Sequence, residues 1–209
     1  MRQRSCKLWL LAAAAMVLSA SALKAALPTT PDISGPTSVT GQLLVATPAL
    51  RGPPFERAVI LVAQHNKDGA LGIVINRPLD QVPIAQLLAA FGADPAGVTG
   101  KVRVFLGGPV DPNLGFVLHS AEYRDVDTMD IDGRVALNSG PQILRYIGLG
   151  KGPHKILVAM GYAGWAPSQL DDELKQGFWA TVPEDPALVF DDDRSNVWAD
   201  AMARYKPGR

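Results

Sequence analysis

Short, mostly apolar runs that stop at glycine- or proline-containing motifs are the feature of this sequence that most constrains its fold. Runs of this length and β-branched content are typical of strands, because helices need longer stretches with apolar residues three or four apart. Three such junctions are present: Ala70–Ile75 before Asn76-Arg77-Pro78, Val102–Leu106 before Gly107-Gly108-Pro109-Val110, and Ile156–Met160 before Gly161-Tyr162-Ala163-Gly164-Trp165. Each predicts a strand end where backbone and polar or aromatic side chains come together, which is where sheet proteins commonly place a site.

The composition indicates one globular domain rather than a disordered chain. The chain has 209 residues, of which 47% are hydrophobic and 19% are charged. Its 20 glycines and 17 prolines are scattered between the apolar runs. They therefore predict many short elements joined by turns.

The first 22 residues have the three-part pattern of a secretory signal peptide. A basic start precedes the uncharged apolar run Leu8–Leu18, and Ala20-Ser21-Ala22 supplies small residues at a cleavage position. The apolar run is too short to span a bilayer comfortably as a helix. We therefore expect a leader over residues 1–22 and a periplasmic protein. The alternatives are an uncleaved interfacial anchor, or a misassigned start codon and a cytoplasmic protein.

The leader carries three of the 20 basic residues, none of the 20 acidic ones and the only cysteine, Cys6. Its removal leaves a formal charge of −3 and no thiol. A mildly acidic domain without a basic stripe is a poor nonspecific nucleic-acid binder. We therefore expect no nucleic-acid partner, and no stable membrane span once the leader is removed. Residues 23–40, which contain three prolines, predict an extended linker before a domain over 41–209.

Strand and helix patterns alternate from Gly41 onward, which predicts a mixed sheet of the α+β or α/β class. The expected strands are Gln42–Ala46, Ala58–Gln64, Ala70–Asn76, Val102–Leu106, Leu114–His119 and Lys155–Met160. Helices are expected over Pro83–Phe91, Pro167–Gln176 and Asn196–Arg204. A further helix should begin at the capping-box spacing of Ser139-Gly140-Pro141-Gln142 and run through Ile147. Another should begin at Pro186, with Asp185 as its cap. The second strand, nearly all apolar, should be buried on both faces, and turn residues at 66–69 make a hairpin with the third.

Arg77 is the first candidate for a binding site. Pro78 disfavours helical geometry at Arg77 and so fixes it as an extended strand exit. The planar guanidinium suits a carboxylate or a phosphate. Its partner is either a ligand or, more commonly, one of the protein's own acidic side chains. The neighbouring amide of Asn76 can bridge two backbone segments.

Glycines and aromatic residues mark the other two junctions. Gly107 and Gly108 let backbone approach another group, but they lack the lysine and the spacing of a phosphate loop, so a tight turn or bulge is the commoner explanation. Tyr162 and Trp165 can line a shallow pocket, although aromatic residues in this position more often cover the core. Glu173, on the helix that follows, can point the same way as Trp165 or can be a solvated surface residue.

His65 and His119 each end a strand. Two histidines could begin a metal site, but no partner stands at ligand spacing, and a core or turn histidine with one hydrogen bond is the commoner case. The sequence also contains no GxSxG nucleophile elbow and no calcium-loop spacing. We therefore expect no metal and no cofactor.

Several motifs, taken in order, resemble the YqgE/AlgH family along nearly the whole of residues 41–190. They are Gly41-Gln42-Leu43-Leu44-Val45-Ala46, Phe55-Glu56-Arg57, His65 with Gly69-Ala70-Leu71-Gly72, the three junction motifs, Gly115-Phe116-Val117-Leu118-His119, Gln169-Leu170 and Glu173-Leu174. The resemblance implies a compact mixed-sheet fold with a small barrel-like core and surrounding helices. It also implies that the three junction motifs group at one surface. The family is generally regarded as cytoplasmic and is named after a proposed regulatory role, so the export-like leader departs from it.

Two function classes follow. The first is a non-catalytic binding or regulatory module for a small anionic ligand or a protein partner, with Arg77, the Gly107-Gly108 turn, Tyr162 and Trp165 at its site. The alternative is a hydrolase-type small-molecule enzyme in which His65 or His119 works with Glu173 as acid and base. The alternative needs a histidine within hydrogen-bond reach of Glu173, directly or through one water.

Overall fold

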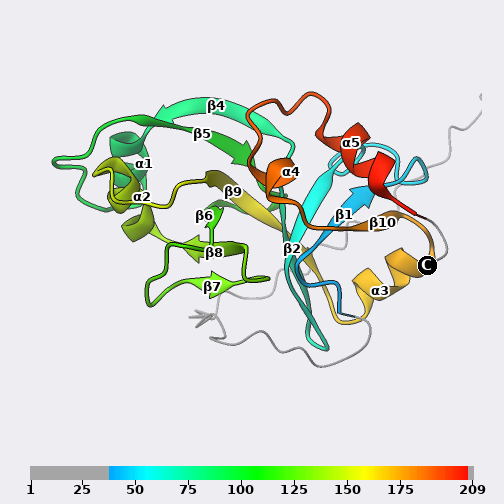
Figure 1. Ribbon diagram of the computed structural model, residues 1–209. Helices are drawn as coiled ribbons and strands as arrows, with labels where there is room; N and C mark the ends of the chain where they lie inside the picture. Colours follow the sequence, from blue (N-terminus) through cyan, green and yellow to red (C-terminus); the bar gives the residue numbers. More distant parts are fainter. Residues whose placement is uncertain (1–37, 207–209) are drawn as a thin grey trace, which may run out of the picture.

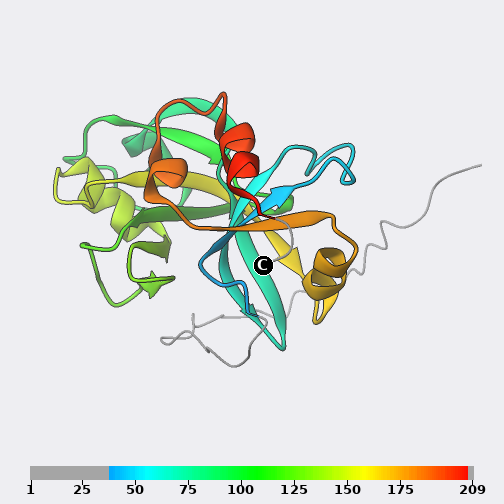
Figure 2. The same cartoon turned by 45° about the vertical axis from the view of Figure 1, so that its right-hand side comes forward.

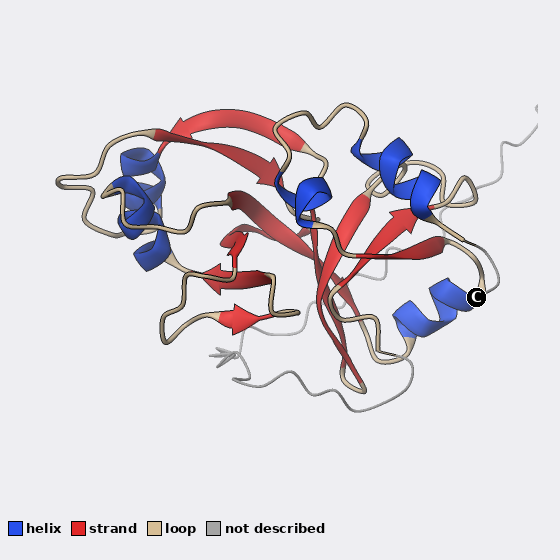
Figure 3. Cartoon of the chain, viewed as in Figure 1, coloured by secondary structure: helices blue, strands red, loops and turns tan. Residues whose placement is uncertain are grey.

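The computed structural model describes residues 38–206, and its strands lie between helices at the two ends of the molecule (Figures 1 and 3). The strands are β1 (Gln42–Ala46), β2 (Val59–Asn66), β3 (Gly69–Val74), β4 (Pro78–Pro83), β5 (Lys101–Leu106), β6 (Val110–Ser120), β7 (Met129–Asp130), β8 (Val135–Ser139), β9 (Ile156–Trp165) and β10 (Trp179–Pro183). The helices are α1 (Ile84–Ala90), α2 (Pro141–Gly148), α3 (Gln169–Lys175), α4 (Pro186–Phe190) and α5 (Val197–Arg204). The expected leader and most of the expected linker lie outside the described residues.

The sheet is mixed and curls into a half-barrel. Its strand order is β10-β1-β2-β3-β9-β6-β8-β7, with antiparallel neighbours throughout, while β5 runs parallel to β9 and pairs with β4. Strand β9 joins the two halves of the sheet. Its first half, Ile156–Met160, pairs with β5 and β6, and its last residues pair with β3. This architecture confirms the predicted α+β class and the barrel-like core.

Strand β2 lies between β1 and β3 in the sheet, and a core covers each of its two faces. Val59, Leu61 and Ala63 pack into one core, whereas Ile60 and Val62 pack into another. Successive side chains of a strand point to opposite faces, so a strand covered on both sides needs an unbroken apolar run. The hairpin of β2 with β3 is also confirmed.

Helices close the two ends of the sheet. At one end α1 and α2 cover a third core, in which Leu88 and Leu144 pack with Val104 of β5 (Figure 1). At the other end α5 lies against β1, β2 and β10, and the Trp198 Nε1–H donates to the carbonyl oxygen of Ala46 at 2.8 Å. The loop over residues 47–57 consequently lies beside α5 (Figure 2). No helix within residues 38–206 is long and apolar enough to cross a membrane.

The sequence predicts a strand that ends at Met160, whereas β9 continues to Trp165. Gly161 has a backbone φ of +70°, and next to it the pairing of β6 with β9 shifts register between Val110 and Gly115. A glycine at such an irregularity lets a strand bend without ending. Residues 161–165 therefore form strand rather than a loop leading to α3.

The predicted capping box before α2 is also wrong. Ser139 is the last residue of β8 and pairs with Phe116 of β6, so strand pairing takes it away from the helix. Gly140, with φ +109°, precedes α2 and supplies no side-chain cap. The predicted cap of α4 is confirmed, because the Asp185 carboxylate accepts from the Ala187 N–H at 2.8 Å. Four strands are missing from the sequence-based expectation: β4, β7, β8 and β10.

Candidate functional site

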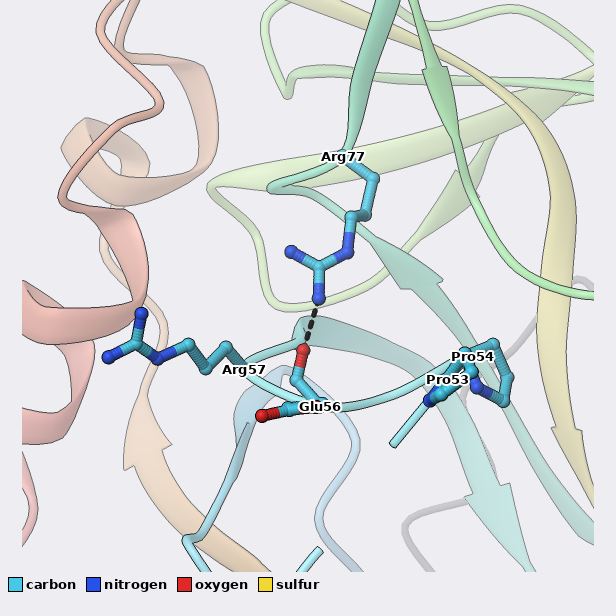
Figure 4. A pocket seen from close by; sticks show the side chains of 5 residues that line it. All are labelled: Pro53, Pro54, Glu56, Arg57 and Arg77. Atoms are coloured by element: carbon cyan, nitrogen blue, oxygen red, sulfur yellow. Dashed lines mark hydrogen bonds between the residues drawn. The ribbon is translucent and has the colours of Figure 1, made fainter. Parts of the chain in front are cut away.

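Arg77 lies between β3 and β4, at the strand exit predicted for it. Its carbonyl oxygen accepts from the Leu106 N–H at 2.9 Å, which fixes its backbone. Its Nη2 donates to the main-chain carbonyl oxygen of Glu56 (Figure 4). The internal ion pair, which was the commoner expectation, is not formed with any carboxylate of residues 38–206.

Asn76 has the bridging role predicted for its amide. Its Oδ1 accepts from the Val59 N–H at 2.9 Å, and its Nδ2 donates to the Arg57 carbonyl oxygen at 2.8 Å. Arg57 has a backbone φ of +55°, in the left-handed region that residues with a Cβ disfavour. The buried amide of Asn76 therefore helps to hold Arg57 in an uncommon conformation.

Arg57 and Arg77 line an open cavity together with Arg194, which precedes α5. The volume of this cavity is about 370 Å³. Its remaining lining residues are Asn76, Ser195, Asn196, Trp198 and Ala199. The fold thus gathers three arginines from three separate segments around one hollow, which we call the arginine cavity.

Stacking holds Arg57 in place. Its Cζ lies 4.9 Å from the centre of the Trp198 ring, within the range of a cation–π contact. Among residues 38–206 its side chain has no hydrogen-bond acceptor, so its N–H groups are available to a ligand. In the close view the Arg57 side chain extends toward the helical segment and away from Pro53 and Pro54 (Figure 4).

Arg194 is held more tightly. Its Nη1 donates to the Leu188 carbonyl oxygen at 2.9 Å, and its Cζ lies 5.2 Å from the centre of the Phe105 ring. Its Nε is buried without a hydrogen-bond partner in the described part of the chain. Burial lowers the pKa of Arg194, and the charge of Arg103 lowers it further. The carboxylates of Asp191 and Asp192 act in the opposite direction and raise this pKa.

Three arginines make the charge around the cavity positive, and the carboxylate of Glu56 lies nearby. Arg57, Arg77 and Arg194 make no ion pair with the carboxylates of residues 38–206, whereas four other arginines do: Arg124, Arg134, Arg145 and Arg204. The Glu56 Oε2 accepts from the Gly52 N–H at 3.2 Å. A guanidinium without a carboxylate partner keeps its hydrogen-bond fork for an external anion.

Two further hollows adjoin the arginine cavity, and Arg57 lines both. One, of about 340 Å³, is lined by Pro53, Pro54, Glu56, Arg57 and Arg77 (Figure 4). The other, also of about 340 Å³, is lined by Thr47, Pro48, Leu50, Arg51, Glu56, Arg57 and Trp198. Because all three share Arg57, they form one indented region of the surface.

Gly107 and Gly108 permit a close backbone crossing. The Gly107 N–H donates to the Met160 carbonyl oxygen at 2.7 Å, and the Val74 N–H donates to the Gly107 carbonyl oxygen at 2.8 Å. A Cβ on Gly107 would lie 2.3 Å from the carbonyl oxygen of Gly161. Gly108 also borders a small hollow of about 40 Å³ that Arg77 lines. The Asn-Arg-Pro and Gly-Gly-Pro motifs therefore lie side by side, with Arg77, Gly108 and Pro109 lining the same small hollow.

Tyr162 and Trp165 do not line the arginine cavity. Three positions apart in one strand, they pack in different cores: Tyr162 makes an edge contact with Phe116, and Trp165 makes one with Trp179. Burial raises the pKa of Tyr162, and the Asp111 carboxylate acts in the same direction. The two rings therefore cover the core, which was the commoner of the two alternatives for aromatic residues in this position.

Glu173 lies beside Trp165, as its spacing predicts. Its Oε2 accepts from the indole N–H of Trp165 at 2.9 Å and from that of Trp179 at 2.7 Å, and its Oε1 accepts from Gln169 Nε2 at 2.9 Å. The carboxylate is thus neither a freely solvated surface group nor a member of the arginine cavity. It supplies the acceptor that two largely buried indoles require.

In the described part of the chain, neither histidine forms a hydrogen bond or an ion pair with Glu173. His119 is fully buried, with Nδ1 3.0 Å from the Ser120 carbonyl oxygen and Nε2 2.8 Å from Asn138 Oδ1. His65 accepts at Nδ1 from the Val39 N–H at 3.3 Å, and its Nε2 is 3.7 Å from Asp171. In the described part of the chain, no three histidine, cysteine, aspartate or glutamate side chains cluster to hold a metal.

Sequence reasoning missed two of the three arginines. Arg57 stands in the motif Phe55-Glu56-Arg57, but nothing local shows that its backbone turns it toward Trp198. Arg194 follows three aspartates, which were interpreted as helix-capping charge, so Arg194 itself was not proposed as a site residue. Arg57 and Arg194 both reach the arginine cavity only because the C-terminal segment packs against the loop before β2.

Comparisons with known proteins agree with the fold. The AlgH-like family model matches residues 43–207. A UPF0301 protein of Rhodospirillum rubrum is 42% identical over 166 residues, which cover 79% of this chain and 86% of the relative. The solution structure of the AlgH protein from Pseudomonas aeruginosa has a TM-score of 0.70 and 36% identity, covering 82% of this chain and 90% of that one. A crystal structure from Corynebacterium diphtheriae, 24% identical with a TM-score of 0.63, shares the fold over 80% of this chain and 87% of that one.

Proposed function

This chain belongs to the AlgH-like family, and we propose that it is a non-catalytic binding module that takes a small anionic ligand into the arginine cavity. One observation supports the proposal most strongly. Arg57, Arg77 and Arg194 line the same cavity, and none of them pairs with a carboxylate of the described residues. A phosphate or carboxylate group would supply the charged partner that the three arginines lack, and acceptors for those of their N–H groups that do not donate to a backbone carbonyl.

The start of α5 also lies at the cavity. Ser195 and Asn196 line the cavity immediately before α5; Asn196 makes no side-chain cap, whereas Ser195 donates both its N–H and its hydroxyl to Asp193. The free N–H groups at the start of a helix carry partial positive charge, which adds to the field of the arginines. The anion would therefore sit against the arginines with the first turn of α5 beside it.

The alternative, a hydrolase-type enzyme, has no supporting contact among the described residues. Both ring nitrogens of His119 face acceptors other than Glu173, and both oxygens of Glu173 are engaged by other side chains. His65 is nearest to Asp171 and a backbone N–H. The geometry thus favours binding over acid–base chemistry.

Calorimetric titration with inorganic phosphate tests the proposal. We expect Arg77→Ala to weaken phosphate binding by about tenfold or more, because a hydrogen-bonded charge contact is lost. The melting temperature should change little, since Arg77 gives up only one hydrogen bond to a backbone carbonyl. Arg145→Ala is the matched control, because Arg145 lies on α2 and already interacts with Asp94. Equal phosphate affinities in the two variants would contradict the proposal.

A further inference from the structure

Arg57 lies between two of the three hollows of the indented surface, which are similar in size. On one side it lines the arginine cavity with Arg77 and Arg194, and on the other it lines a second hollow with Arg51. The volumes are about 370 Å³ and about 340 Å³. Each hollow alone has room for a phosphate-sized group, and the shared arginine joins them.

The second hollow has a charge of its own. Arg51 is exposed and donates from Nε to the Pro48 carbonyl oxygen at 3.3 Å. Like the three arginines of the first cavity, it makes no ion pair with the carboxylates of residues 38–206. The loop over residues 47–57 thus carries two arginines without a carboxylate partner, Arg51 near its middle and Arg57 at its end.

Glu56 determines how an anion could use both hollows. Glu56 lines the second hollow and the one shown in Figure 4, but not the arginine cavity. It therefore repels an anionic group in the second hollow, whereas Arg51 and Arg57 in the same lining attract that group. An anionic group in the second hollow is therefore held best when it is linked to another one in the arginine cavity.

We propose, building on the proposed function, that the natural ligand carries at least two separated anionic groups. One occupies the arginine cavity with Arg77 and Arg194, the other contacts Arg51 in the second hollow, and Arg57 contacts both. The ligand class is a small polyanion, such as a compound with linked phosphate groups.

Tripolyphosphate and orthophosphate are the probes that test this inference, titrated into the full chain at low ionic strength with a chelator present. We expect tripolyphosphate to bind more tightly than orthophosphate. Arg51→Ala should weaken tripolyphosphate binding about three- to fivefold, the range of one exposed charge contact, and should leave orthophosphate binding unchanged. Arg145→Ala should affect neither probe.

The outcomes separate this inference from the function on which it rests. If Arg77→Ala weakens both probes but Arg51→Ala weakens neither, the second anionic group is refuted and the anion site stands. If the two probes bind equally well to the unmodified protein, the inference is likewise refuted. If orthophosphate does not bind, or binds Arg77→Ala unchanged, the proposed function itself is refuted.

Discussion

The side chain of Arg57 enters the arginine cavity from a backbone with φ +55°. In this region a residue with a Cβ is about 1 kcal/mol less stable than glycine. The hydrogen bond from Asn76 to its carbonyl and the stacking on Trp198 offset that cost. Backbone strain at a binding residue is a common arrangement, because the surrounding structure fixes the side chain in advance.

Two substitutions of Arg57 separate the strain from the charge. Glycine should relieve the left-handed strain, whereas alanine should retain it. We expect Arg57→Gly to have a free energy of unfolding about 1 kcal/mol higher than Arg57→Ala, with phosphate affinity reduced equally in both. Urea unfolding and phosphate titration measure the two effects. An alanine variant as stable as the glycine variant would show that the strain is absent.

Glu184 is a buried carboxyl outside the cavity. Its Oε2 lies 2.6 Å from Arg134 Nη2, and its other charged neighbours are Asp132 and Asp185. Burial raises the pKa of Glu184 to about 8, the hydrogen bond and the charge of Asp132 add to the increase, and Arg134 opposes it. In the unfolded chain the usual value is 4.5. The folded protein therefore keeps a proton on Glu184 over a range where the unfolded chain has released it.

This difference predicts a loss of stability with increasing pH. The contribution of Glu184 is complete below about pH 4.5 and is lost as the pH rises toward about 8, by up to about 1.4 kcal/mol per pH unit. Glu184→Gln cannot titrate and should flatten the slope across this window. Urea unfolding at several pH values measures it. Parallel slopes in the two proteins would count against a protonated Glu184.

At the scale of elements, glycine decides where β9 bends. A Cβ on Gly161 would lie 2.5 Å from the Gly108 carbonyl oxygen and 2.9 Å from that of Val110. Gly150, after α2, has the same φ of +70° but open space around its Cα. The two positions thus share a backbone conformation and differ in crowding.

Alanine at these two positions should have unequal effects. Gly150→Ala should cost about 1 kcal/mol, for the left-handed conformation alone. Gly161→Ala should cost about 3 kcal/mol or more, because the crossing strands must also move apart. Chemical denaturation of both variants gives the comparison. Similar losses would mean that the crossing of β9 with the Gly107-Gly108 segment is looser than the structure indicates.

Local patterns explain which elements were predictable. The apolar run of β2, the turn that follows it and the Asp185 cap each contain their own signal, and all three were found. Strand β4 has proline at both ends and the polar residues Asp80 and Gln81 at its centre, so only its pairing with β5 makes it a strand. Strand β8 was not predicted, and its last residue, Ser139, was misread as a helix cap because of its capping-box spacing. Pairing of β8 with β6 overrides that local signal.

At the scale of the whole molecule, the site was only partly predictable. Asn76 and Arg77 have a local signal, since Pro78 fixes the strand exit. Arg57 and Arg194 converge only when α5 packs on β1, a contact between distant segments. Trp165 and Glu173 were expected at the site because they are polar or aromatic near a glycine-rich motif, yet the structure uses them to close the core beside α3.

Export of the chain also concerns the whole molecule and stays a prediction from residues 1–22. The chain expressed from its own start with a C-terminal tag should yield a periplasmic product whose N-terminus lies near Leu23. Intact mass and cell fractionation measure this directly. A full-length product in the cytoplasm would contradict the leader and would restrict the ligand to cytoplasmic compounds.

The arginine cavity is a local positive site on a chain whose formal charge is zero. Its central test is a ¹H–¹⁵N NMR titration of the protein with inorganic phosphate, including the Nε–H signals of the arginine side chains. We predict saturable shifts confined to residues 51–57, 76–77 and 194–199, with the Nε–H signals of Arg57, Arg77 and Arg194 among the largest. Shifts that do not saturate, or that centre elsewhere in the chain, would contradict an anion site at this cavity.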